Sequence, residues 1–94
     1  MPVATAVRSD RDLSRILLAL SNETRLQIVR LVAEGGSLYC SDVLSRFPLS
    51  QPTMSHHLNL LLDSGALHEH RDGLRRYYTV DRDLLRRFGL HILD

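Results

Sequence analysis

Two short amphipathic segments on either side of Pro48 constrain the fold of this chain more than any other feature. In the first, apolar residues recur at the i, i+3, i+4 and i+7 positions of a helix, and they are Cys40, Val43, Leu44 and Phe47. The second predicted helix follows a cap at Ser50, carries Pro52 in its first turn and ends at Gly65. Its expected buried side consists of Met54, Leu58, Leu61 and Leu62. Two helices joined by so tight a turn predict a helix-turn-helix.

Two further helices are predicted before this pair. The first starts at Asp10, and its apolar positions are Leu13, Ile16, Leu17 and Leu20. Residues 1–9 show no helical or strand period, so they are expected to be flexible. The second helix follows a cap at Ser21 or Asn22 and stops at the glycines of residues 35–36.

After the pair, the pattern changes from helical to extended. Asp72 and Gly73 separate two extended runs, and this dipeptide is a strong hairpin signal because a tight turn requires a positive φ. Asp81 and Asp83 then open a last predicted helix, with apolar positions at Leu84, Leu85, Phe88 and Ile92. With 94 residues, the chain is expected to be a single domain, residues 1–94. The predicted fold is mainly α with a β-hairpin wing, a winged helix-turn-helix.

The outer side of the helix after Ser50 is polar but uncharged. Residues 50–59 contain no Asp, Glu, Lys or Arg, whereas an ordinary solvated helix normally carries such charges. A carboxylate on this side would repel phosphates, so the composition favours base reading in a DNA major groove. The candidate DNA-reading residues are Ser50, Gln51, Thr53, Ser55, His56, His57 and Asn59. The alternative is an ordinary solvated helix face.

Arginines supply the candidate phosphate contacts. The formal charge is only +1, but all twelve basic residues are arginine. Arg71, Arg75 and Arg76 bracket the wing turn, where they could hold phosphates or enter the minor groove. The alternative is a solvated hairpin, because Glu69 and Asp72 dilute the patch.

Other classes of protein find little support in the sequence. No Gly-rich phosphate loop, nucleophile elbow or metalloprotease signature occurs, so no enzyme is expected. No apolar run approaches the roughly 20 residues that span a bilayer, and a cytoplasmic protein without a membrane partner is expected. The single cysteine excludes an intramolecular disulfide.

Over about residues 13–90, the chain resembles the ArsR/SmtB family of dimeric winged-helix repressors. The residues that carry the resemblance are Ser50, Gln51, Pro52, Ser55, His57, Leu58, Leu60, Leu61, Ser64, Gly65 and Tyr78. The resemblance implies a homodimer held by the first and last helices, with one reading helix for each half-site of an inverted repeat in double-stranded DNA. It also implies repression that ends when an effector, often a metal ion, arsenite or an oxidant, favours a form of low affinity.

The sequence departs from the family's best-known sensors. Where many members carry paired thiols, residues 39–41 read Tyr-Cys-Ser, so the usual paired-thiol metal site is absent and no cofactor is assigned. Cys40 lies on an apolar stripe, which favours a structural role over a redox switch. His91 and Asp94, spaced i, i+3, are candidate metal ligands between paired last helices. His68 and His70 share one strand face and form a weaker candidate.

A second class of function stays open. A winged helix also occurs as a protein-interaction module, or as a regulator controlled by a partner protein rather than by a metal or small ligand. A sequence-selective complex with an inverted repeat, weakened steeply by salt, would distinguish DNA binding from this alternative.

Overall fold

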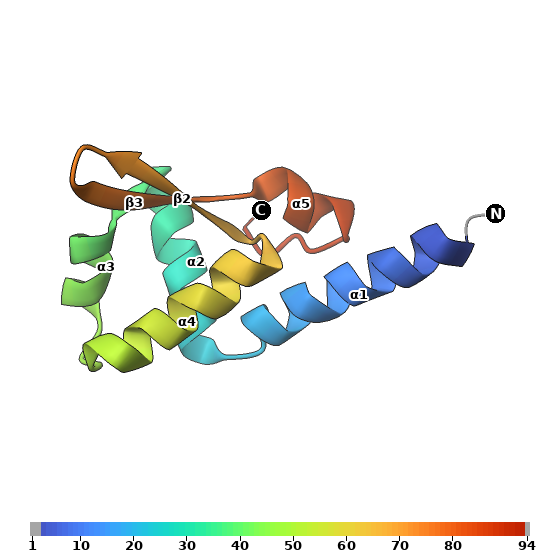
Figure 1. Cartoon of the computed structure of the whole chain (residues 1–94), viewed down its shortest axis with the longest axis horizontal. Helices are drawn as coiled ribbons and strands as arrows, with labels where there is room; N and C mark the ends of the chain where they lie inside the picture. The colour runs from blue at the N-terminus through green and yellow to red at the C-terminus, as the bar shows by residue number, and fades with distance from the viewer. Residues whose placement is uncertain (1–2, 94) are drawn as a thin grey trace.

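The computed structural model describes residues 3–93, with side chains from Asp10 onward (Figure 1). In chain order the elements are α1 (Val3–Leu20), α2 (Glu23–Gly35), β1 (Leu38–Tyr39), α3 (Cys40–Arg46), α4 (Gln51–Ser64), β2 (Leu67–Asp72), β3 (Arg75–Val80) and α5 (Arg82–Arg87). The helices α3 and α4 form the expected pair, and β2 and β3 form the hairpin. The predicted fold class, mainly α with a β-hairpin wing, is confirmed.

The ends of α2 and α4 lie at the predicted capping residues. The Asn22 side-chain oxygen accepts a hydrogen bond from the backbone N–H of Arg25 at 3.1 Å. At the start of α4, Ser50 Oγ accepts from the backbone N–H of Thr53 at 3.3 Å. Helix α4 stops at Gly65, whose φ of 83° lies in the left-handed region that favours glycine.

The core lies where α1, α2 and α4 meet the sheet. Side chains of these elements, of α3 and of α5 form one apolar cluster, which includes Ile16, Ala19, Ile28, Val29, Val32, Val43, Met54, Leu61, Leu67, Tyr78 and Leu85. Each buried Leu or Ile side chain contributes about 1.5–3 kcal/mol to stability. The cluster therefore fixes one side of α4 to the body and leaves the other side outside.

The sheet has three strands in the order β1-β3-β2, one more than predicted. β1 pairs with β3 in antiparallel register, with Leu38 opposite Tyr78. In the hairpin, Asp72 is opposite Arg75, which leaves Gly73 and the next residue as the turn. Gly73 has a φ of 63°, as the hairpin prediction required.

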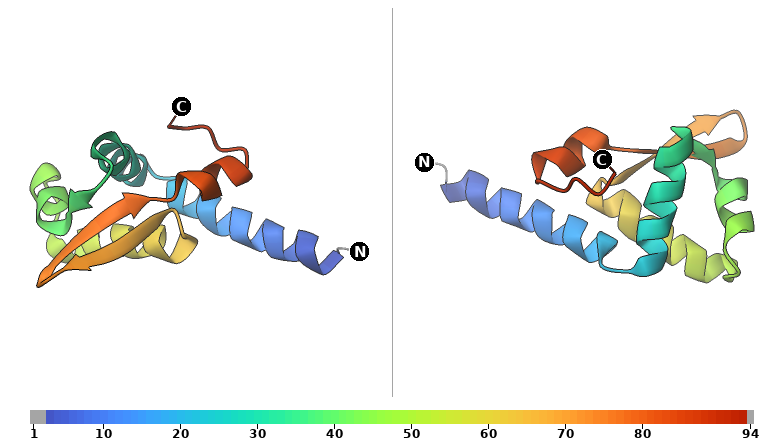
Figure 2. Two further views of the ribbon diagram at one scale, coloured as in Figure 1. Left: turned by 90° about the horizontal axis from the view of Figure 1, so that it is seen from above. Right: turned by 180° about the vertical axis from the view of Figure 1, so that it is seen from behind.

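Helix α1 begins at Val3, before the predicted start at Asp10. Residues 3–9 are helical, where the sequence predicted no element, and residues 1–2 lie outside the described part. The expected flexibility of residues 1–9 stays a prediction. Figure 2 shows the first half of α1 extending away from the body. The sequence of residues 3–9 shows no helical period, so periodicity did not reveal this part of the helix.

Helix α5 ends at Arg87, although the sequence predicted that it would continue to Ile92. Gly89, with a φ of 75°, follows the helix. Its N–H donates to the Arg86 carbonyl oxygen at 2.9 Å, and the N–H of Leu90 donates to Leu85 at 2.9 Å. This pair of bonds is a Schellman motif, which terminates a helix at glycine.

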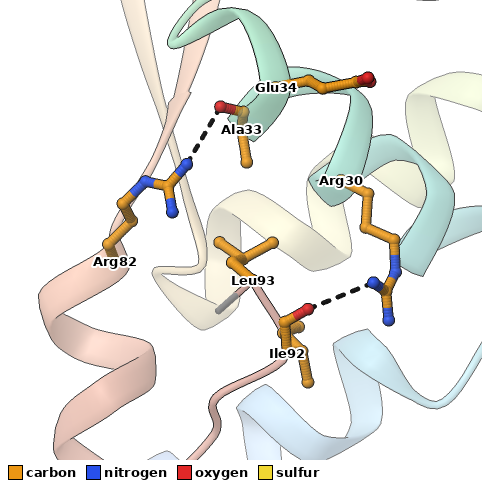
Figure 3. Close-up of a pocket in the computed structure, with 6 residues that line it drawn as sticks. All are labelled: Arg30, Ala33, Glu34, Arg82, Ile92 and Leu93. Atoms are coloured by element: carbon orange, nitrogen blue, oxygen red, sulfur yellow. Dashed lines mark hydrogen bonds between the residues drawn. The ribbon is translucent and has the colours of Figure 1, made fainter.

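The tail after α5 folds back toward α2 (Figure 3). Arg30 Nη1 donates to the Ile92 carbonyl oxygen at 3.2 Å, and Arg82 Nη2 donates to the Ala33 carbonyl oxygen at 3.0 Å. Both arginines and Glu34 line a depression between α2 and the tail. Within residues 3–93 there is no helix that is both long and apolar enough to cross a membrane.

Candidate nucleic-acid interface

The outer side of α4 is open to solvent. Its predicted DNA-reading residues Ser50, Gln51, Thr53, Ser55, His56 and Asn59 are all exposed, whereas Met54, Leu58 and Leu61 on the other side are buried. The step of about 100° per residue along a helix produces this division. The structure thus brings six candidate readers together on one uncovered face.

The first turn of α4 is held in place by side chains. Ser50 Oγ, which caps the helix, also donates to Thr53 Oγ1 at 2.9 Å. Pro52 occupies the first turn, where its missing N–H leaves no unsatisfied donor. The start of the helix, which in a helix-turn-helix meets the base edges, is therefore well defined.

His57 differs from the other candidates because it is only half-exposed and faces the body. Its Nδ1 lies 3.1 Å from Nη1 of Arg25, a buried residue of α2. Burial first, then the charge of Arg25 and then His56, lower the pKa of His57 below its ordinary value. His57 thus connects α4 to the interior, a role that the sequence did not predict.

The three wing arginines are exposed, but two of them make contacts on the protein. Arg76 donates to Glu69 Oε1 at 3.5 Å and to Cys40 Sγ at 3.4 Å. The guanidinium carbon of Arg75 lies 3.6 Å from the centroid of the Tyr39 ring. Stacking on a ring restricts Arg75 and leaves its charge unneutralised, whereas Glu69 opposes the charge of Arg76.

An aromatic row on the wing was not predicted. The rings of Tyr39 and Tyr77 contact each other edge to face at 5.7 Å, and His70 stacks on Tyr77 at 4.9 Å. The Tyr39 hydroxyl donates to Asp72 Oδ2 at 2.7 Å, and this bond raises the pKa of Tyr39. The row braces the strands next to the turn, whose Leu74 is fully exposed. Tyr39 belongs to β1, a strand that the sequence analysis did not predict. The contacts of Tyr39 on the wing could therefore not be predicted either.

Cys40 lies in a groove between α4 and the wing. Gln51, Asn59, Glu69 and Arg76 contribute to the walls of this groove. The thiol is buried, with an exposed fraction of 8% for the residue, and its sulfur accepts the hydrogen bond from Arg76. The apolar placement expected from the sequence is observed, and a redox role stays a prediction.

The candidate metal ligands at the end of the chain are not on a common helix. His91 lies beyond the Schellman motif that ends α5, so the predicted helical i, i+3 spacing does not apply, and Asp94 lies outside the described residues. From residue 3 to residue 93, no three His, Cys, Asp or Glu side chains are grouped as metal ligands.

The wing histidines have other partners. His68 Nε2 lies 2.8 Å from Asp81 Oδ2, and His70 Nε2 lies 2.8 Å from Thr79 Oγ1. The bond from His68 lowers the pKa of Asp81, which also caps α5 through the N–H of Leu84. Both imidazoles therefore tie neighbouring elements together.

Comparisons with known proteins agree with this geometry. Residues 20–70 match a family model described as a helix-turn-helix domain. The arsenical resistance operon repressor of Staphylococcus aureus is 38% identical over 77 residues, which are 82% of this chain and 73% of the relative. The transcriptional repressor SdpR of Bacillus subtilis is 33% identical over 73 residues, 78% of this chain and 80% of the relative.

A solved structure extends the likeness to three dimensions. It is the solution NMR structure of the homodimeric winged helix-turn-helix DNA-binding domain Mb0332 from Mycobacterium bovis, described as a possible ArsR-family regulator. It is 30% identical with a TM-score of 0.78, and the match covers 96% of this chain and 82% of that one. Fold, exposed helix and relatives together define a winged helix-turn-helix transcriptional regulator. The chain belongs to the ArsR family, which consists of DNA-binding regulators and not of enzymes.

Proposed function

We propose that this protein is a homodimeric repressor that binds an inverted-repeat operator. The observation that carries the proposal is the exposed, uncharged face of α4. A major groove admits a helix, Gln can bind adenine through two hydrogen bonds, and Ser or Thr can serve several bases. The proposed contact residues are Ser50, Gln51, Thr53, Ser55, His56, His57 and Asn59 on α4, and Arg71, Arg75 and Arg76 on the wing.

Helix α1 supports the dimeric part of the proposal. Leu17 and Leu18 are exposed to 48% and 59%, although both are large apolar side chains. The first half of α1 extends beyond the body, where a second copy of the chain could cover it (Figure 1). Because α5 ends at Arg87, α1 would supply more of the interface than the last helix. The similar domain from Mycobacterium bovis is described as homodimeric.

The repressor part of the proposal follows the relatives, since two of the most similar proteins are named as repressors. The test is a mobility-shift assay with DNA from upstream of the protein's own gene. We expect a sequence-selective complex whose affinity falls steeply with salt. Repeating the assay with zinc, nickel, cadmium, arsenite and peroxide identifies an effector by release of the DNA. Equal binding to unrelated DNA would contradict operator recognition and favour the interaction-module alternative.

A matched pair of glutamines tests the reading face. Gln51 and Gln27 are both exposed helical residues, on α4 and α2 respectively. Gln51→Ala should weaken the operator complex by about tenfold, since a good base contact contributes about 1–3 kcal/mol, and should leave the melting temperature unchanged. Gln27→Ala should leave both quantities unchanged. The same loss of affinity in both variants would remove α4 as the reading helix.

A further inference from the structure

Arg25 is a buried arginine that forms no ion pair with an acidic side chain of the described residues. Its exposed fraction is 8%, and the ion pairs formed among residues 3–93 do not include it. A buried charge must find strong hydrogen bonds or it destabilises the fold. Arg25 therefore requires a structural explanation.

The partners of Arg25 come from two other helices. Its Nε donates to the Ala19 carbonyl oxygen at 2.7 Å, and Nη2 donates to Leu18 at 3.3 Å. These carbonyls lie at the end of α1, where acceptors lack helical partners and the helix dipole is negative. Nη1 points to Nδ1 of His57 on α4 at 3.1 Å. One side chain of α2 thus joins the end of α1 to the reading helix.

The chemistry of this contact determines the tautomer of His57. A guanidinium only donates hydrogen bonds, so Nδ1 of His57 must carry a lone pair and the ring proton must be on Nε2. A protonated imidazole has no lone pair at Nδ1 and would repel Arg25. Contact with Arg25 therefore requires neutral His57.

We propose that Arg25 positions the reading helix for DNA by binding the Nε2–H tautomer of His57, so that protonation of His57 breaks the contact and weakens operator binding. The inference rests on the proposed function, because it assumes that α4 reads the operator. The lowered pKa of His57 agrees with a site that keeps the ring neutral.

The charged and titratable groups that act on His57 are Arg25 from α2 and His56 from its own helix. The Leu18 and Ala19 carbonyl oxygens of α1 accept hydrogen bonds from the same Arg25 guanidinium. Arg15 and Asp63 line a depression between α1 and α4. Acidification normally strengthens binding to phosphates, because histidines gain positive charge. A histidine that only faces DNA should raise the affinity at low pH. Loss of the Arg25–His57 contact should lower it, so the two cases are distinguished by the sign of the change in affinity.

The first test is NMR of the histidine ring nitrogens without DNA. We expect the Nε2–H tautomer for His57 in the wild type and a mixture of tautomers in Arg25→Lys, since a lysine ammonium cannot reproduce the fork of three contacts. A wild-type spectrum with the proton on Nδ1, or an unchanged tautomer in Arg25→Lys, would overturn the proposal.

The second test is the pH profile of operator affinity from about pH 8 to about pH 5. In the wild type we expect operator affinity to fall at pH values below the pKa of His57. For each subunit of the dimer, the decrease should approach about tenfold per pH unit. His57→Gln offers Arg25 a side-chain oxygen that does not titrate, so the affinity that this variant shows at neutral pH, even if it is lower than in the wild type, should not fall further on acidification. His56→Gln, the control on the same helix, should retain the pH dependence. A loss of affinity that persists in His57→Gln would refute the proposal. If the wild type binds no operator at any pH, the proposed function fails, and the ring-nitrogen spectra still decide whether Arg25 holds His57.

Discussion

Replacing Arg75 by glutamine should make operator binding less sensitive to salt. Arg75 is exposed beside the wing turn, and stacking on Tyr39 at 3.6 Å orders its side chain without neutralising its charge. Each phosphate neutralised by a basic side chain contributes about 0.9 to the slope of log affinity against log salt. A dimer with one such contact per subunit should therefore lose about 1.8 from its slope.

The assay is operator affinity measured between about 50 and about 200 mM salt. Over this fourfold range, a slope change of about 1.8 makes the loss of affinity about twelvefold smaller in Arg75→Gln than in the wild type. Arg75→Lys keeps the charge and should keep the slope. Arg76→Gln should change it less, because Glu69 already opposes that charge. Arg30→Gln, the same charge change outside the wing, is the control, and an equal decrease there would refute the wing contact.

Three further predictions concern stability. Ser50→Ala removes the cap of α4 and should lower the free energy of unfolding by about 1 kcal/mol in urea titrations. An alanine in the left-handed region costs about 1–2 kcal/mol. Gly65→Ala should lower the free energy of unfolding by more than this, because its Cβ would also lie 3.0 Å from a leucine methyl group of α5. Gly89→Ala, at a glycine that also follows a helix, with a φ of 75° and no atom within 4 Å of the added Cβ, is the control, and equal losses would contradict the steric part. The folded-state pKa of Asp81 is below its ordinary value of 3.8, so its stabilising effect is present above that value and is lost as the pH falls through the folded-state pKa. His68→Ala should therefore reduce the acid-induced decrease in stability, and an unchanged acid titration would show that this bond contributes little.

The sequence predicted the elements whose ends depend on local chemistry. Asn22 and Ser50 cap their helices as expected, and Gly65 ends α4, because capping needs only a short side chain or a positive φ at one position. The Asp72-Gly73 hairpin formed for the same reason. The open face of α4 was predictable too, since its opposite side carried enough leucines to define the direction of burial.

Elements that depend on distant contacts were missed. β1 has two residues, which is too short for a period of two to be visible, and it exists because β3 offers an unpaired edge. The end of α5 had a readable signal in Gly89, directly after a basic turn. Because Ile92 is apolar and fits the helical period, the sequence analysis extended the helix past the stop signal at Gly89. In the structure Ile92 packs against the core from the tail, so the period arose from a fold-back and not from a helix.

The two adjacent histidines show why a residue type does not determine its role. Successive residues of a helix differ in direction by about 100°, so His56 can face outward while His57 faces Arg25. Nothing near His57 in the sequence identifies its partner, because Arg25 belongs to another helix. From the sequence alone, an arginine in that helix is expected to lie at the surface. Once the fold buries Arg25 against the end of α1, the nearest ring nitrogen on α4 must serve as an acceptor. One histidine thereby makes a contact inside the protein, and the other lies on the proposed DNA-reading face.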